Sequence, residues 1–137
     1  MSPVVDRLTQ LRLHLDHLRE LRPRVESPAS LRQDLSLHND VLFSLLTVCQ
    51  LVIDIASELS TRRKQRFDDY TESIRSLEVY PEFPSSVLRE LEKLPGFRNV
   101  LVHEYVALDF QRVINALDHL EPVEDFAEIV RRLETEV

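Results

Sequence analysis

Residues 42–59 read LFSLLTVCQLVIDIASEL and form the most apolar stretch of the chain. Their apolar side chains recur at steps of three and four residues, which is the spacing of one face of an α-helix. The same spacing extends back to Leu31, and Ser27-Pro28 before it is a typical helix start, with the serine as cap and the proline in the first turn. The sequence therefore predicts one long central helix that continues to Leu59.

Other helical stripes lie on both sides of this stretch. The first runs from Val4 to Leu18 and ends before Pro23. Later helices are expected at residues 68–78, 85–94, 98–105, 109–117 and 122–133, with a proline-bounded loop at 80–84 and a basic connector at 61–66. No strand-like alternation or repeat is present. The prediction is a single domain, 1–137, of the all-α class: an up-and-down helical bundle of four main helices plus a short helix, with the first stripe antiparallel to the central helix.

The composition excludes several classes of protein. The net charge of −7 argues against a general nucleic-acid binder, because affinity for phosphate comes mainly from Lys and Arg. A single glycine, Gly96, excludes glycine-rich phosphate loops. A single cysteine, Cys49, excludes an internal disulfide, and its apolar neighbours predict a buried, unreactive thiol. No uninterrupted apolar run approaches the ~18 residues of a membrane span, so a cytoplasmic protein is expected.

The most specific motif is Phe-Arg-Asn-Val-Leu-Val-His-Glu-Tyr at residues 97–105, directly after Pro95-Gly96, which is expected to interrupt the preceding helix. An arginine beside a histidine, a near-neutral proton carrier, can act on phosphate esters without a metal. On a helix, Arg98 and His103 diverge by about 140°, whereas Arg98 and Tyr105 lie nearly in line. If a second protomer supplied the facing groups, Arg98 and His103 of one chain would not need to reach the same atom.

This motif resembles the signature of the HepT-like branch of the HEPN superfamily, the toxin halves of prokaryotic HEPN–MNT toxin–antitoxin pairs. The family pattern is Arg, four residues, His, one residue, Tyr, and residues 51–56 resemble its central-helix segment. The resemblance implies a metal-independent endoribonuclease without a cofactor, in which Arg98 and His103 are catalytic and Asn99 orients His103 or caps the local backbone. It also implies a homodimer or higher even-numbered assembly, and an MNT-type nucleotidyltransferase antitoxin that silences the toxin by transferring AMP to Tyr105.

Two other functions stay open at this point. One is a non-catalytic helical module that binds a nucleotidyltransferase or presents a substrate to it, and the other is a helical assembly protein. The basic connector at 61–66 is either a solvated loop or a contact for RNA or the antitoxin. His14 and His17, three residues apart on the first helix, lack an evident third ligand, so no metal site is predicted.

Overall fold

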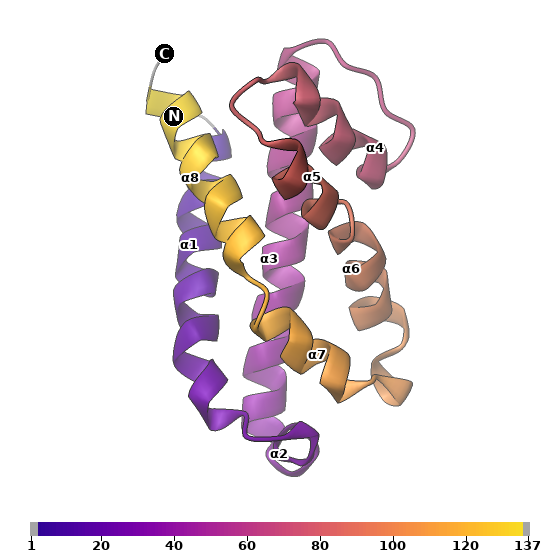
Figure 1. Ribbon diagram of the computed structural model, residues 1–137. Helices are drawn as coiled ribbons and strands as arrows, with labels where there is room; N and C mark the ends of the chain where they lie inside the picture. Colours follow the sequence, from indigo (N-terminus) through magenta and orange to yellow (C-terminus); the bar gives the residue numbers. More distant parts are fainter. Residues whose placement is uncertain (1–2, 136–137) are drawn as a thin grey trace.

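The computed structural model describes residues 3–135, and its helices run up and down along four paths (Figure 1). α1 descends, α3 ascends beside it, α4 to α6 descend on the other side of α3, and α7 and α8 lead back up. Within these residues there is no strand, so the prediction of an all-α up-and-down bundle is confirmed. The elements are α1 Pro3–Leu21, η1 Arg22–Arg24, α2 Pro28–Gln33, α3 Leu35–Arg62, α4 Tyr70–Arg75, η2 Ser76–Val79, α5 Ser85–Leu91, α6 Leu94–His103, η3 Tyr105–Ala107, α7 Phe110–Leu117 and α8 Glu121–Thr135, where η denotes a 3₁₀ turn.

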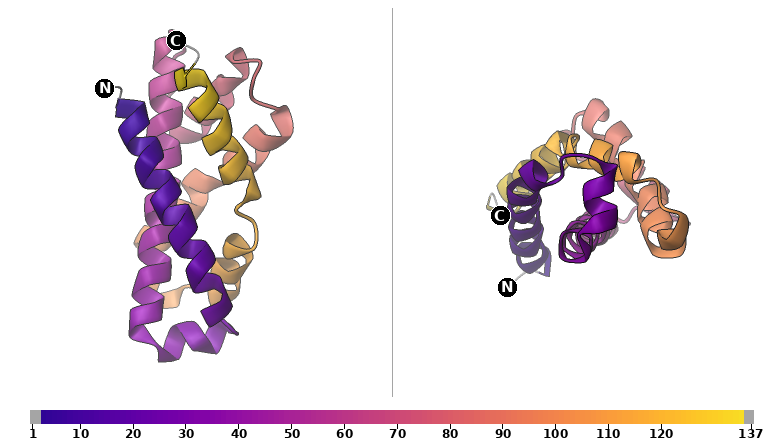
Figure 2. Two further views of the ribbon diagram at one scale, coloured as in Figure 1. Left: turned by 90° about the vertical axis from the view of Figure 1, so that its left-hand side faces the viewer. Right: turned by 90° about the horizontal axis from the view of Figure 1, so that it is seen from below.

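The core forms around α3, which lies between α1 on one side and α6 on the other (Figure 2). α1 and α3 are antiparallel, as the sequence predicts, and α8 packs along α1. The side chains of Val52, Ile53 and Phe126 have no exposed surface and lie at the centre. Removing this apolar surface from water is the main force that holds the helices together.

The predicted helix from residue 28 to 59 is wrong in one respect, because it is interrupted at Asp34. This residue has an extended backbone, with φ −113° and ψ 99°, and separates α2 from α3. Its carboxylate accepts a hydrogen bond from the backbone N–H of Leu37 at 3.1 Å. Such a cap satisfies one of the free donors in the first turn of a helix, so a new helix can begin where the apolar spacing alone shows no break.

Asp34→Ala is expected to lower the free energy of unfolding by about 1 kcal/mol, because the first turn of α3 loses its cap. Chemical denaturation followed by circular dichroism measures this change. Asp40→Ala is the matched control, since the carboxylate of Asp40 is exposed on α3 and makes no hydrogen bond or ion pair within residues 3–135. Equal stability of the two variants would contradict the capping role of Asp34.

α3 is the one helix among the described residues that is long and apolar enough to cross a membrane by length and composition. This measure averages hydropathy over an 18-residue window, whereas the expectation concerned uninterrupted apolar runs, and α3 contains none of that length. Half of its most apolar window is buried inside the bundle, and the core helix of a soluble protein passes the same test. The apolar side chains of α3 are accounted for by its central place in the core.

The predicted interruption before the motif occurs earlier than Pro95-Gly96. α5 ends at Leu91, a turn follows at residues 92–93, and α6 begins at Leu94. Pro95 lies in the first turn of α6, where its missing N–H is not needed for a helical hydrogen bond. Gly96 is exposed, and a Cβ placed on it would meet no atom within 4 Å.

The predicted basic connector is shorter than residues 61–66, because α3 continues to Arg62. Arg62 forms an ion pair with Glu134 of α8, and the guanidinium of Arg63 lies 4.2 Å from the ring centroid of Tyr80. The chain turns at Lys64, which has a positive φ of 58°. Two of the basic side chains thus make contacts within the bundle.

Candidate functional site

The motif residues are held by α6, which packs its apolar face against α3. Leu101 is buried, and Leu94 and Phe97 are half-buried against the core. The spacing of these three residues places them on one face of the helix. The polar residues of the motif therefore project from the remaining surface of α6.

Arg98 is anchored to α3 through the side chain of Gln50. Its Nε donates to Gln50 Oε1 at 3.1 Å, and its Nη1 donates to Asn99 Oδ1 at 3.1 Å. The amide of Gln50 in turn donates to Asp54 Oδ1 at 2.9 Å. This row of hydrogen bonds, Asp54–Gln50–Arg98–Asn99, fixes the guanidinium of a half-buried arginine at the α3–α6 contact.

Gln50 is a functional candidate that sequence reasoning missed. It interrupts the apolar stretch of residues 42–59 with an amide, and Asp54 lies one turn further on. Two polar residues at that spacing on an otherwise apolar helix face are a signal that a polar partner lies opposite. The structure also places Asn99 against Arg98, whereas the resemblance implies contact with His103 or the local backbone.

His103 and Tyr105 lie at the open end of the same helix. His103 is the last residue of α6 and is exposed, and its side chain makes no hydrogen bond or ion pair within residues 3–135. The helix ends because Glu104 leaves helical geometry, with φ −120° and ψ 23°, and Tyr105 begins the 3₁₀ turn η3. The predicted helix over 98–105 is therefore two residues too long, and the alignment of Tyr105 with Arg98 is lost. Arg98 and His103 keep their divergence of about 140°, since both belong to α6.

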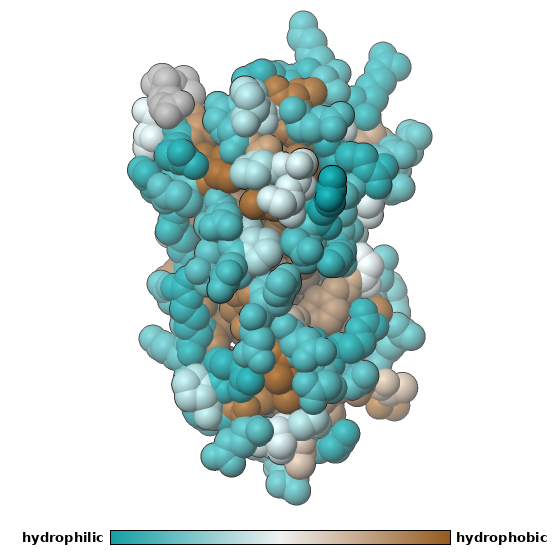
Figure 3. Space-filling model, viewed as in Figure 1, coloured by the Kyte–Doolittle hydropathy of each residue, from teal (hydrophilic) through white to brown (hydrophobic). Residues whose placement is uncertain are grey.

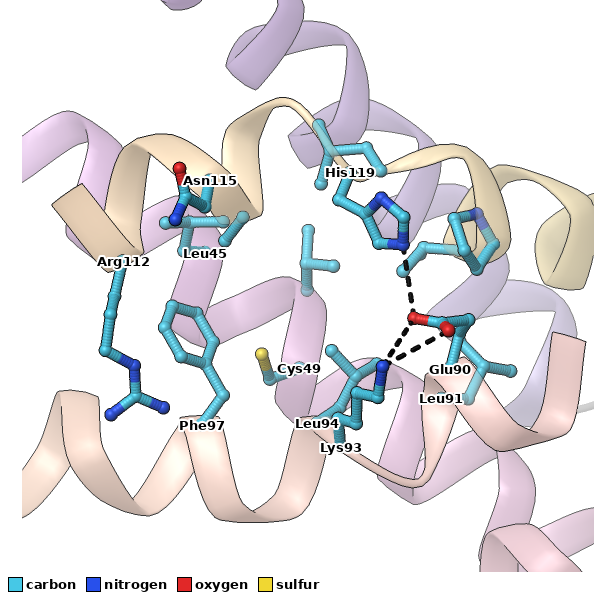
Figure 4. A pocket seen from close by; sticks show the side chains of 15 residues that line it. Leu45, Cys49, Glu90, Leu91, Lys93, Leu94, Phe97, Arg112, Asn115 and His119 are labelled. Atoms are coloured by element: carbon cyan, nitrogen blue, oxygen red, sulfur yellow. Dashed lines mark hydrogen bonds and ion pairs between the residues drawn. The ribbon is translucent and has the colours of Figure 1, made fainter.

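The hollow behind α6 takes in only one residue of the motif, Phe97. A cavity of about 350 Å³ opens between α3, α5, α6 and α7, with apolar side chains on its floor (Figure 3). Figure 4 shows Phe97 and Cys49 pointing into it and an ion-pair cluster of Glu90, Lys93 and His119 at one side. Neither Arg98 nor His103 lines this cavity.

The thiol of Cys49 lies at the floor of this cavity and is 2% exposed. Burial raises the pKa of Cys49 to about 12, and this effect exceeds the opposing influence of the nearby Arg98 charge. A thiol with such a pKa is protonated at neutral pH and is a poor nucleophile. The prediction of a buried, unreactive cysteine is confirmed.

The histidines of α1 make contacts within the bundle. His14 Nδ1 lies 3.0 Å from Ser44 Oγ, and its ring packs against that of Phe43. Burial is the main cause that lowers the pKa of His14, and the neighbouring His17 lowers it further. Across the described residues, no three His, Cys, Asp or Glu side chains gather in a way that could hold a metal ion.

Comparison with known sequences identifies the family. Residues 11–131 match the family described as Ribonuclease HepT-like. The chain belongs to the HepT-like ribonuclease family. The mRNA nuclease HepT of Shewanella oneidensis is 26% identical over 102 residues, which cover 73% of this chain and 77% of that protein.

Solved structures with the same fold agree with this assignment. A tri-AMPylated HEPN toxin of Shewanella oneidensis, solved in complex with its MNT antitoxin, superposes with a TM-score of 0.83 at 21% identity and covers 96% of this chain and 99% of that one. A cytosolic protein of unknown function from Bacillus subtilis, YutE, has a TM-score of 0.71 at 17% identity and covers 94% of this chain and 92% of its own. At these identities the likeness establishes the fold.

Proposed function

We propose that this protein is a metal-independent endoribonuclease, the toxin of a HEPN–MNT pair that acts in the cytoplasm. The observation that supports it best is the anchored Arg98 on the same helix as a solvent-accessible His103, in a chain of the HepT-like ribonuclease family. RNA carries its own nucleophile, the 2′-hydroxyl, so an enzyme of this kind needs only to move protons and stabilise charge.

The proposed reaction proceeds in one displacement at phosphorus. His103 accepts the proton of the 2′-hydroxyl, or donates a proton to the leaving group, while the 2′-oxygen forms a bond to the scissile phosphorus. The bond from phosphorus to the 5′-oxygen breaks, and that oxygen takes up a proton. Arg98 binds the phosphate oxygens as their charge grows, and Asn99 and Gln50 position the guanidinium. The products are a 2′,3′-cyclic phosphate and a 5′-hydroxyl.

Cleavage is expected to continue in EDTA and to stop when the nucleotide at the cut carries a 2′-deoxy sugar. The physical reason is that the nucleophile belongs to the substrate and no protein-bound metal takes part. The measurement is product analysis on gels with a defined RNA and its singly 2′-deoxy counterpart. Loss of activity in EDTA, or normal cutting of the deoxy substrate, would contradict the mechanism.

We further propose that the active form is a homodimer, or a higher even-numbered assembly, whose two α6 helices line one cleft. The divergence of Arg98 and His103, and their absence from the lining of the cavity behind α6, support it. A second copy would bring two Arg98 cations together, which offsets locally the net charge of −7.

Light scattering of the active preparation at micromolar concentration is expected to give twice the mass of one chain, or an even multiple of it. As a further check, mixing inactive Arg98→Ala and His103→Ala proteins should restore part of the activity if the cleft combines residues of both chains. An active monomer would contradict the shared cleft.

Regulation is proposed to act on Tyr105 through an MNT-type nucleotidyltransferase. The phenol oxygen of Tyr105 attacks the α-phosphorus of Mg·ATP, the bond to the β-phosphate breaks, pyrophosphate leaves and the phenol proton passes to a base. The exposed side chain of Tyr105 supports this role, since the hydroxyl must enter another enzyme's active site. The modification adds bulk and negative charge two residues from His103, where RNA phosphate would bind.

A further inference from the structure

A groove lies beside Tyr105, between the junction of α2 with α3 and the turn that leads from η3 into α7. Its volume is about 530 Å³, within the range of small-molecule sites. Val106 forms part of one wall, and Arg32, Leu35, His38 and Phe110 contribute to the rest. The groove is separate from the cavity behind α6, with which it shares no lining residue.

The walls of this groove combine flat, apolar and cationic surfaces. The guanidinium carbon of Arg32 lies 5.5 Å from the ring centroid of Phe110, and the His38 ring meets that of Phe110 edge-on at 5.6 Å. Apart from this contact with Phe110, the side chain of Arg32 makes no ion pair or hydrogen bond within residues 3–135. Guanidinium planes and aromatic rings are surfaces on which bases stack, and an arginine without an acidic partner is suited to a phosphate.

Two large apolar side chains at this groove are open to water. Val106 is 88% exposed and Leu35 is 70% exposed, whereas Leu31 and Leu108 of the same groove are buried. Such exposure is unfavourable for aliphatic side chains, and a flat ring laid against them would remove apolar surface from water. The groove therefore suits an occupant that is apolar at one end and anionic at the other.

A group attached to the side chain of Tyr105 could be such an occupant. Because α6 ends at His103, Tyr105 starts η3 and directly precedes Val106 in the groove wall. A group bonded to the side chain of Tyr105 is tethered one residue along the chain from the groove wall, so its local concentration there is high and weak contacts suffice to hold it.

We propose that this groove binds the adenosine monophosphate attached to Tyr105, with the adenine against Phe110 and Val106 and the phosphodiester at Arg32. The proposal rests on the adenylylation of Tyr105 put forward above and assigns the modified tyrosine a docked position on its own chain. In this position the nucleotide lies at the end of α6 that carries His103. It blocks the approach of RNA there and is itself shielded from enzymes that would remove it.

The test measures how fast a 5′-phosphodiesterase removes the AMP. The full chain is adenylylated with an MNT-type nucleotidyltransferase and Mg·ATP, freed from that enzyme, and followed by intact-mass spectrometry until the tyrosine-linked AMP is gone. Arg32→Ala and Phe110→Leu are each expected to speed removal by about fivefold or more, because loss of one stacking or phosphate contact raises the undocked fraction.

Arg112→Ala is the matched control, since Arg112 is also exposed and lies 5.9 Å from the centroid of an aromatic ring, that of Phe97, at the other cavity. The phosphodiesterase should remove AMP from the Arg112→Ala variant at the same rate as from the unsubstituted protein. A second measurement is the methyl NMR spectrum. Adenylylation should change the chemical shifts of the Val106 and Leu35 methyl groups in the unsubstituted protein, and should change them much less in Arg32→Ala. If Phe110→Leu fails to fold, Arg32→Ala and the spectrum decide.

The outcomes separate this proposal from the one on which it rests. No AMP on Tyr105 would overturn the adenylylation and the docking together. AMP on Tyr105 with equal removal rates in all variants and unshifted Val106 methyls would overturn the docking alone. Protection that exists only while the nucleotidyltransferase is present would also overturn it, because the partner, and not the groove, would then cover the nucleotide.

Discussion

His103→Ala is expected to lower the rate constant of RNA cleavage by about 10²–10⁴-fold, the usual contribution of a general acid or base. Because the imidazole of His103 is exposed and makes no hydrogen bond or ion pair within residues 3–135, the variant loses no described side-chain bond. Helical circular dichroism, the denaturation midpoint and the size of the assembly should therefore equal those of the unsubstituted protein. Full activity of this variant would exclude the acid–base role.

Arg98→Ala is expected to lower activity by about 10²–10³-fold, as the loss of a preorganised donor to developing charge does. Unlike His103→Ala, it also breaks the contact with Gln50 of α3 and should cost about 1 kcal/mol of stability. Gln50→Leu is the control, since it removes the same contact and keeps the guanidinium. If Gln50→Leu matched Arg98→Ala in both stability and activity, Arg98 would have a structural role alone.

The sequence predicted the helical paths because burial on one face of a helix leaves a spacing of three and four apolar residues. It predicted the start of α7 because Asp109 is a cap, and its carboxylate does accept from the N–H of Gln111 at 2.9 Å. The loop at 80–84 was also predicted, from its two prolines, and is confirmed. Each of these features depends on residues that are close together in the chain, so it can be predicted from one sequence.

The features that the sequence did not predict depend on tertiary contacts or on weak local signals. Leu31 and Leu35 keep helical spacing across Asp34, so the break between α2 and α3 is visible only in the cap itself. α6 ends at His103 without a glycine or proline to mark it, because the chain must turn there to bring α7 back to the bundle. The partnership of Arg98 with Gln50 joins residues 48 positions apart and needs the packing of α6 on α3.

The end of α6 at His103 changes where an AMP on Tyr105 would lie. With a helix through residue 105, an AMP on Tyr105 would lie nearly in line with Arg98 and could pair with it. With the helix ended at His103, Tyr105 belongs to η3 and its neighbour Val106 forms the wall of a different surface. Silencing by a nucleotide held beside His103 requires no contact between the AMP and Arg98.

Adenylylation of Tyr105 is expected to abolish RNA cleavage, leaving only the activity of the unmodified fraction. The reason is that the phosphodiester brings negative charge and an adenosine to the exposed end of α6, where the RNA phosphate must approach His103. Tyr105 is 64% exposed, so modification itself needs no unfolding. The measurement pairs intact-mass spectrometry with a cleavage assay on the same samples, taken at intervals after addition of an MNT-type nucleotidyltransferase and Mg·ATP.

Tyr105→Phe is the deciding control, because it removes only the acceptor oxygen and keeps the ring. This variant should gain no AMP and should retain its activity in the presence of the nucleotidyltransferase and ATP. Tyr70→Phe serves as the matched comparison, since Tyr70 is also exposed and lies on α4. It should be modified and silenced as the unsubstituted protein is. AMP additions that persist in Tyr105→Phe would assign the acceptor elsewhere, and a fully adenylylated protein that still cleaves RNA would separate the modification from silencing.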